Sequence, residues 1–125
     1  MTDVQSERIS RTAAHRQAVQ IGQRDLVGAL VDKLGARLVA YVVDRDRSTI
    51  SRWASSGELP LEADRALRAV YQVFRLLEPI ESDHTIRAWF LGMNPQLDDV
   101  SPAEAIRDGR FRDVMAAARA FEVGG

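Results

Sequence analysis

Apolar residues recur along this chain at helical spacing, and no segment alternates with a period of two. A first stripe runs from Leu26 to Leu34 and ends at Gly35, a residue suited to close a helix, so a helix is predicted over about residues 24–34. Two shorter apolar groups follow, over residues 36–43 and around Ile50 and Trp53. They predict two short helices joined by a tight turn.

Four prolines, at positions 60, 79, 95 and 102, lie between the periodic runs, where a missing N–H does least damage. The longest run, over residues 61–78, predicts the longest helix. Ser82 can cap a helix that stops at Gly92, and Ser101-Pro102-Ala103-Glu104 is a capping box for another. A last stripe starts at Phe111. The predicted fold class is all-α, with about seven helices.

Composition narrows the possible functions. The 125 residues, 46% hydrophobic and 28% charged, suit one globular domain or two very small ones. The net charge is -1, with +2 over residues 1–58 and -3 over residues 59–125, so any nucleic-acid contact must come from a local patch. The absence of cysteine excludes disulfides, thiol nucleophiles and cysteine-based metal sites, and it fits a cytoplasmic protein.

Catalytic motifs are missing from the sequence. There is no P-loop, GxGxxG or GxSxG pattern, and the two histidines, His15 and His84, are far apart. No stretch is as long and apolar as a membrane-spanning helix, and the start lacks the apolar region of a signal peptide. We therefore expect no enzyme activity, no cofactor, no metal site and no membrane attachment.

Residues 36–55 fit the residue spacing of a helix-turn-helix motif. Ala40 is the small residue where two helices meet, and Val39, Val43, Ile50 and Trp53 are apolar anchors. Asp44 takes the turn position where glycine is commonest, because its short side chain tolerates a left-handed backbone. Arg45 departs from the pattern, since an apolar residue usually follows.

The outward face of the second helix of this pair suits DNA. With Ile50 and Trp53 inside, hydroxyl and guanidinium side chains face outward, and both groups bond phosphates or base edges. The alternative is a solvated face on an ordinary helical hairpin, and Asp44 and Asp46 offset part of the positive charge. The predicted DNA-binding residues are Arg45, Arg47, Ser48, Ser51, Arg52 and Ser55.

The back half carries a second ordered pattern. Its members are Trp89, Asn94-Pro95, Leu97, Ser101-Pro102, Gly109 and Val114. In this order they resemble the C-terminal toxin-binding segment of the Xre-type (ParS/MbcA-like) antitoxins of RES-Xre toxin–antitoxin pairs. Asp98 and Asp99 stand where that family usually has glycines. Together with Trp53, Gly57 and Pro60, the resemblance extends over about residues 25–121.

The resemblance implies an N-terminal arm (residues 1–22), a helix-turn-helix DNA-binding domain (23–79) and a small helical toxin-binding domain (80–125). The implied partners are the operator DNA of its own operon and a cognate RES-domain toxin that consumes NAD, whose active site the antitoxin covers. We expect a homodimer or a hetero-oligomer with the toxin. The predicted toxin-binding residues are Trp89, Phe111, Val114, Met115, Phe121 and Glu122.

Other interpretations stay open at this point. The chain could be a stand-alone transcription regulator whose back half only dimerises. It could also be an antitoxin without DNA affinity, for which the charged turn Asp44-Arg45-Asp46 is the warning. The stripe beginning at Phe111 could pack wholly against Trp89 and the long helix instead of facing a partner.

Overall fold

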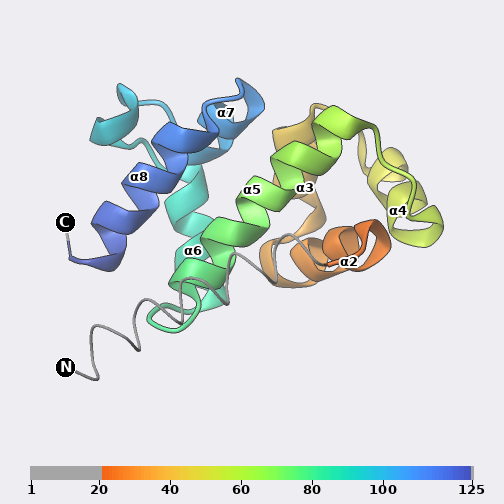
Figure 1. The fold of residues 1–125 in the computed structure, drawn as a ribbon, viewed down its shortest axis with the longest axis horizontal. Coiled ribbons are helices and arrows are strands. Elements are labelled where there is room, and N and C mark those ends of the chain that lie inside the picture. Colours follow the sequence, from red (N-terminus) through yellow and green to blue (C-terminus); the bar gives the residue numbers. More distant parts are fainter. Residues whose placement is uncertain (1–20, 125) are drawn as a thin grey trace.

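The protein is helical throughout the part that the structure describes. The computed structural model describes residues 21–124, so the predicted arm (residues 1–22) and His15 lie almost wholly outside it. The described range holds seven α-helices, one short 3-10 helix and no strand, which confirms the all-α class (Figure 1). No helix in this range is long and apolar enough to cross a membrane. In chain order the elements are α2 (Gln23–Leu34), α3 (Ala36–Val43), α4 (Arg47–Ser56), α5 (Leu61–Leu77), α6 (Asp83–Leu91), η1 (Pro95–Leu97), α7 (Pro102–Arg107) and α8 (Phe111–Glu122).

Short-range signals in the sequence set the helix boundaries. Asp46, Ser82 and Ser101 each accept a hydrogen bond from the backbone N–H three residues further on, at 2.8, 3.1 and 3.0 Å. These bonds satisfy donors that the first turn of a helix leaves unpaired. The predicted serine caps of α6 and α7 are thus confirmed. Gly35, at φ 91°, closes α2 by donating its N–H to the carbonyl of Val31 at 2.9 Å.

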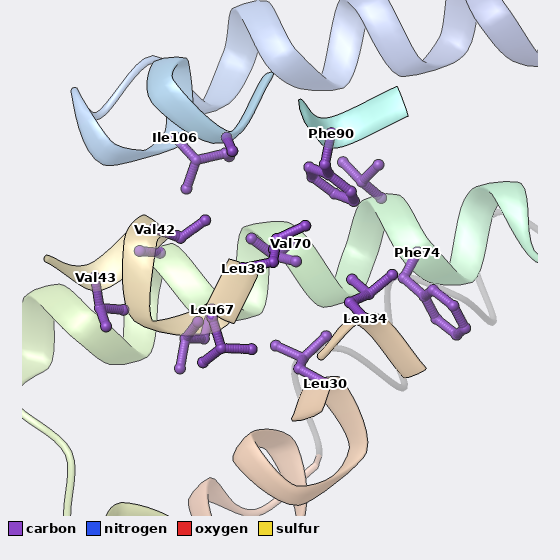
Figure 2. Packing of buried hydrophobic residues seen from close by; sticks show 14 of the residues in the cluster. Leu30, Leu34, Leu38, Val42, Val43, Leu67, Val70, Phe74, Phe90 and Ile106 are labelled. Atoms are coloured by element: carbon purple, nitrogen blue, oxygen red, sulfur yellow. The ribbon is translucent and has the colours of Figure 1, made fainter. Parts of the chain in front are cut away.

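Helix α5 lies at the centre of the fold. It contacts α2 and α3 on one side and α7 and α8 on the other (Figure 1). Its spacing of apolar residues places Leu67, Val70 and Phe74 inside. In Figure 2 Val70 lies between Leu30 of α2 and Phe90 of α6, while Leu67 lies beside Leu30 and Phe74 beside Leu34. Packing on both sides of α5 therefore holds the front and back helices together.

The buried side chains form one continuous cluster that crosses the predicted boundary between residues 79 and 80. It includes residues from every α-helix of the described range, from Leu26 to Ala118. Each large side chain buried in this way contributes roughly 1.5–3 kcal/mol. The division into residues 23–79 and 80–125 stays a prediction about function, and the two segments share one core.

The segment between α6 and α7 contains the short helix η1, which the sequence pattern did not predict. The Asn94 carboxamide oxygen accepts a hydrogen bond from the N–H of Gln96 at 2.9 Å, and Leu97 is wholly buried. Asp98 and Asp99 follow with φ of 59° and 66°. Both aspartates thus adopt the left-handed backbone that glycine would take most easily.

Candidate functional site

A three-residue turn, from Asp44 to Asp46, joins α3 to α4. Asp44 has the left-handed backbone predicted for it, with φ 56° and ψ 51°. The N–H groups of Asp44 and Arg45 donate to the carbonyls of Tyr41 and Ala40 at 3.2 and 3.0 Å. This paired pattern satisfies the last carbonyls of α3. The backbone itself therefore fixes the direction in which α4 leaves the turn.

Asp46 begins α4 as a charged cap. One carboxylate oxygen accepts hydrogen bonds from the backbone N–H of Thr49 at 2.8 Å and from the hydroxyl of Ser48 at 2.9 Å. These bonds, that of the Thr49 backbone above all, lower the pKa of Asp46, and the charge of Arg52 adds a smaller effect. Because Ser48 donates its proton to Asp46, only its acceptor lone pairs remain for a further ligand.

The outward face of α4 is polar and open. Ile50 and Trp53 are buried, as the helix-turn-helix frame predicted. All six predicted DNA-binding side chains are exposed, namely Arg45, Arg47, Ser48, Ser51, Arg52 and Ser55. Arg45 is tied to its own turn, because it donates to the carbonyls of Val43 and Asp44 at 3.1 Å and lies 3.6 Å from Glu62. Among the described residues, Arg47 and Arg52 form no ion pair.

The acidic charge of Asp44 is already paired. Its carboxylate lies 2.7 Å from the Arg107 guanidinium of α7, and that guanidinium also lies 5.0 Å from the centre of the Tyr41 ring. The sequence suggested that Asp44 offsets the arginines of the DNA-facing helix. The structure instead gives it a partner of its own, which spacing alone could not reveal.

The predicted partner-facing residues of the back half fall into separate groups. Trp89 and Phe90 form a T-shaped pair with 5.2 Å between ring centres, and the ring centres of Trp89 and Phe121 lie 6.2 Å apart. Phe121 is therefore half-buried against α6 and is not carried on a free tail. Glu122, the last residue of α8, is half-buried too.

A second group lies along the other side of α8. An open groove of about 450 Å³ between α5 and α8 is lined by Ala69, Gln72, Phe111, Arg112, Met115 and Arg119. Phe111 and Met115 are half-buried there, and the two arginines of the lining are exposed. Val114 is wholly buried, so the structure places it in the core and not on the partner-facing surface predicted for it. Its spacing fitted both positions, and packing decided between them.

Three of the exposed apolar side chains lie near the proposed partner-facing residues in the chain, and the sequence reasoning missed them. Leu91, Met93 and Val123 are 55%, 82% and 73% exposed at the ends of α6 and α8. These three residues lie outside the helical stripes of apolar residues. That mismatch is the sequence signal by which they could have been found.

Arg110 joins the η1 segment to the start of α8. Its guanidinium donates to Asp113 at 3.0 Å and to the Leu97 carbonyl at 3.4 Å, and it lies 3.2 Å from the Asp98 carboxylate. These contacts, led by the hydrogen bond to Asp113, raise the pKa of Arg110. An aspartate at the left-handed position 98 thus supplies an anchor that glycine could not.

No protein-family model matches the chain. It is 26% identical, over 102 residues, to the mycobacterial cidal antitoxin MbcA of Mycobacterium tuberculosis and of Mycobacterium bovis, an alignment that covers 78% of this chain and 89% of each relative. Its fold matches a chain in the crystal structure of the M. tuberculosis MbcT–MbcA toxin–antitoxin complex with a TM-score of 0.68 and 23% identity, over 81% of this chain and 94% of that one. The protein is therefore a homologue of the MbcA antitoxins.

Proposed function

We propose that this protein is an antitoxin that binds and neutralises a cognate toxin through its back half and represses its own operon through α4. One observation carries the proposal, the 26% identity to MbcA antitoxins over 78% of the chain. The solved structure of similar fold is a toxin–antitoxin complex, which supports a toxin as the partner. The protein acts by binding, without catalysis of its own.

The proposed toxin is a RES-domain protein that consumes NAD, as the resemblance of the back half implies. The antitoxin covers its active site with the surface of α6 and α8. Support comes from the half-buried rings of Trp89 and Phe121 and from the groove that holds Phe111 and Met115. Aromatic rings already held by their neighbours lose little conformational freedom on binding, and such residues dominate interface energies.

Co-expression with the product of the adjacent gene tests the toxin assignment. The full chain should co-purify with this product and keep cellular NAD from falling. A chain ending at Ala118 lacks Phe121 and should lose both effects, while its circular dichroism stays helical. If the shortened chain captures and silences the partner with unchanged affinity, the toxin-facing surface lies elsewhere.

The proposed DNA contacts are Arg47 and Arg52, supported by their exposure and by the lack of an ion pair among the described residues. Replacing both by alanine should weaken binding to the operon's own promoter by roughly 1–3 kcal/mol per base-contacting arginine, and should flatten the salt dependence where phosphates are contacted. The matched control replaces Arg112 and Arg119, which removes the same charge from α8. Equal binding by both double variants in a mobility-shift assay would contradict the assignment.

A second candidate function is a stand-alone transcription regulator whose back half dimerises. The exposed Leu91, Met93 and Val123 favour it, because self-association would bury them. Analytical ultracentrifugation of the chain alone separates the two functions. A dimer that ignores the adjacent gene product and binds the promoter would support the regulator, and toxin capture without promoter binding would leave only the protein-binding role.

A further inference from the structure

Arg107 reaches from the back half of the chain to the turn that precedes α4. Its guanidinium lies 2.7 Å from the Asp44 carboxylate and 5.0 Å from the centre of the Tyr41 ring. The Arg107 side chain is 37% exposed and that of Asp44 is 69% exposed. One cation thus engages both a charge in the turn and an aromatic ring of α3.

Apolar packing holds this contact in place. Ile106, the residue before Arg107, is buried and faces Val42 of α3 (Figure 2). Val42, Val43 and Ile106 line the same groove as Asp44 and Arg107. Because α3 and α7 are already packed, Arg107 needs little further ordering to meet Asp44. The pair is therefore better defined than two charges on free surface loops.

The charge of Asp44 bears directly on the proposed DNA-facing helix. Asp44 precedes Arg47 by three residues, so their Cα atoms are at most about 11 Å apart. That distance is close to the Debye length at 0.1 M salt, about 10 Å, and the field of an unpaired carboxylate would reach an approaching phosphate. When Asp44 is paired with Arg107, its negative charge weakens the positive potential of the α4 face less than an unpaired carboxylate would.

We propose that Arg107 is a positioning residue for the DNA-facing surface. It neutralises Asp44 and holds the turn between α3 and α4, so that a residue of the toxin-binding segment sets the DNA affinity of the other segment. This inference rests on the proposed DNA binding for its effect on affinity. Its structural part, the hold on the turn, can be measured without DNA.

The experiment compares Arg107→Gln with Arg119→Gln, which removes the same charge from an exposed position of α8. Arg107→Gln should weaken binding of a promoter duplex about 3-fold or more at low ionic strength, in the range of exposed ion pairs, and less at physiological salt. The loss should shrink in an Asp44→Asn background, because no carboxylate is then left to neutralise. Arg107→Lys should restore part of the affinity.

Amide hydrogen exchange supplies the readout that is independent of DNA. In Arg107→Gln, the N–H groups of Asp44 and Arg45, which bond α3 carbonyls, should exchange faster than in the parent and in Arg119→Gln. If the parent protein does not bind its promoter, the proposed DNA-binding function is wrong. Amide hydrogen exchange alone then tests whether Arg107 holds the turn. Unchanged exchange, or equal affinity losses in Arg107→Gln with and without Asp44→Asn, would overturn the inference.

Discussion

The two proposed binding surfaces of this protein differ in the kind of side chain that they expose. The outward face of α4 carries short hydroxyl side chains and the guanidiniums of Arg47 and Arg52. The surface of α6 and α8 carries half-buried rings, such as Trp89 and Phe121, and exposed aliphatic side chains. Phosphates and base edges need hydrogen-bond donors, whereas a protein partner needs apolar area that can be desolvated. Each surface thus matches the chemistry of one proposed partner.

The helix starts of the two regions differ as well. A carboxylate, Asp46, caps α4, and the hydroxyls of Ser82 and Ser101 cap α6 and α7. The interior does not follow this division, because α5 packs against helices of both regions. The contrast between the regions is therefore confined to surfaces and caps, and a perturbation of the core should reach both.

The largest effect is expected from Phe90→Ala, which empties a wholly buried position under the back surface. The loss should be about 3–5 kcal/mol of unfolding free energy. Trp53 reports on the front region and Trp89 on the back, and the chain has no other tryptophan. Phe90→Ala is placed in Trp53→Phe and Trp89→Phe backgrounds, and urea unfolding is followed by fluorescence. Both regions should unfold in one transition, at a lower urea concentration than without Phe90→Ala.

Leu91→Ala is the control for this change, since Leu91 is 55% exposed on the same helix. Its unfolding free energy should stay within about 0.5 kcal/mol of the parent. Two separate transitions, with only the Trp89 signal shifted by Phe90→Ala, would show that the regions fold independently.

A smaller effect, on the back surface only, is expected from Phe121→Ala. An aromatic anchor at an interface contributes about 2 kcal/mol or more, so the Kd for the toxin should rise about 30-fold. Isothermal titration calorimetry with the purified partner measures it. Val123→Ala, at an exposed position two residues on, should change the Kd far less, and equal losses would show that the ring has no special role.

Gly57→Ala and Gly109→Ala compare turn positions in the two regions. Both glycines have positive φ, 74° and 82°, which costs an alanine about 1–2 kcal/mol. A Cβ on Gly57 would also lie 3.1 Å from the Cβ of Arg24, whereas one on Gly109 would meet nothing within 4 Å. Thermal unfolding should therefore show the larger loss for Gly57→Ala. Equal losses would mean that the Arg24 segment moves aside freely.

The smallest effect concerns acid. The pKa of Asp46 is lowered in the folded protein, so the unfolded chain binds its proton more readily. The stabilisation is complete above the unfolded value, about 3.9, and is lost as the pH falls through the folded pKa. The serine caps do not titrate in this range. Below about pH 4, the amide hydrogen-exchange rate in the first turn of α4 should rise more than the rates in the first turns of α6 and α7. Asp46→Asn should remove that difference.

Local signals in the sequence predicted most of the helices. The serine caps at positions 82 and 101 and the left-handed turn at Asp44 depend on neighbours a few residues away, and the structure has them where expected. The 3-10 helix η1 was missed, because Asn94-Pro95 indicates a turn equally well. The outward direction of α4 followed from the buried Ile50 and Trp53 alone.

Contacts between distant segments were beyond such reasoning. The pairing of Arg107 with Asp44, and of Arg110 with Asp98, depends on how α7 and α8 pack against the rest of the chain. Val114 fitted a stripe that could face either the core or a partner, and only the packing of α8 on α5 placed it inside. The partner-facing residues themselves stay a prediction.

The central position of α5 limits how genes of this type can recombine. A chimaera that joined residues 21–79 of one chain to residues 80–124 of a distant relative would keep α5 but replace the helices packed on its second side. Side chains of α5 such as Val70, which lies next to Phe90, would then meet side chains selected against another helix, with the cavities or overlaps that follow. We therefore expect the two surfaces to be inherited together. A change of toxin should come through point substitutions on α6 and α8, and not through the exchange of whole halves of the chain.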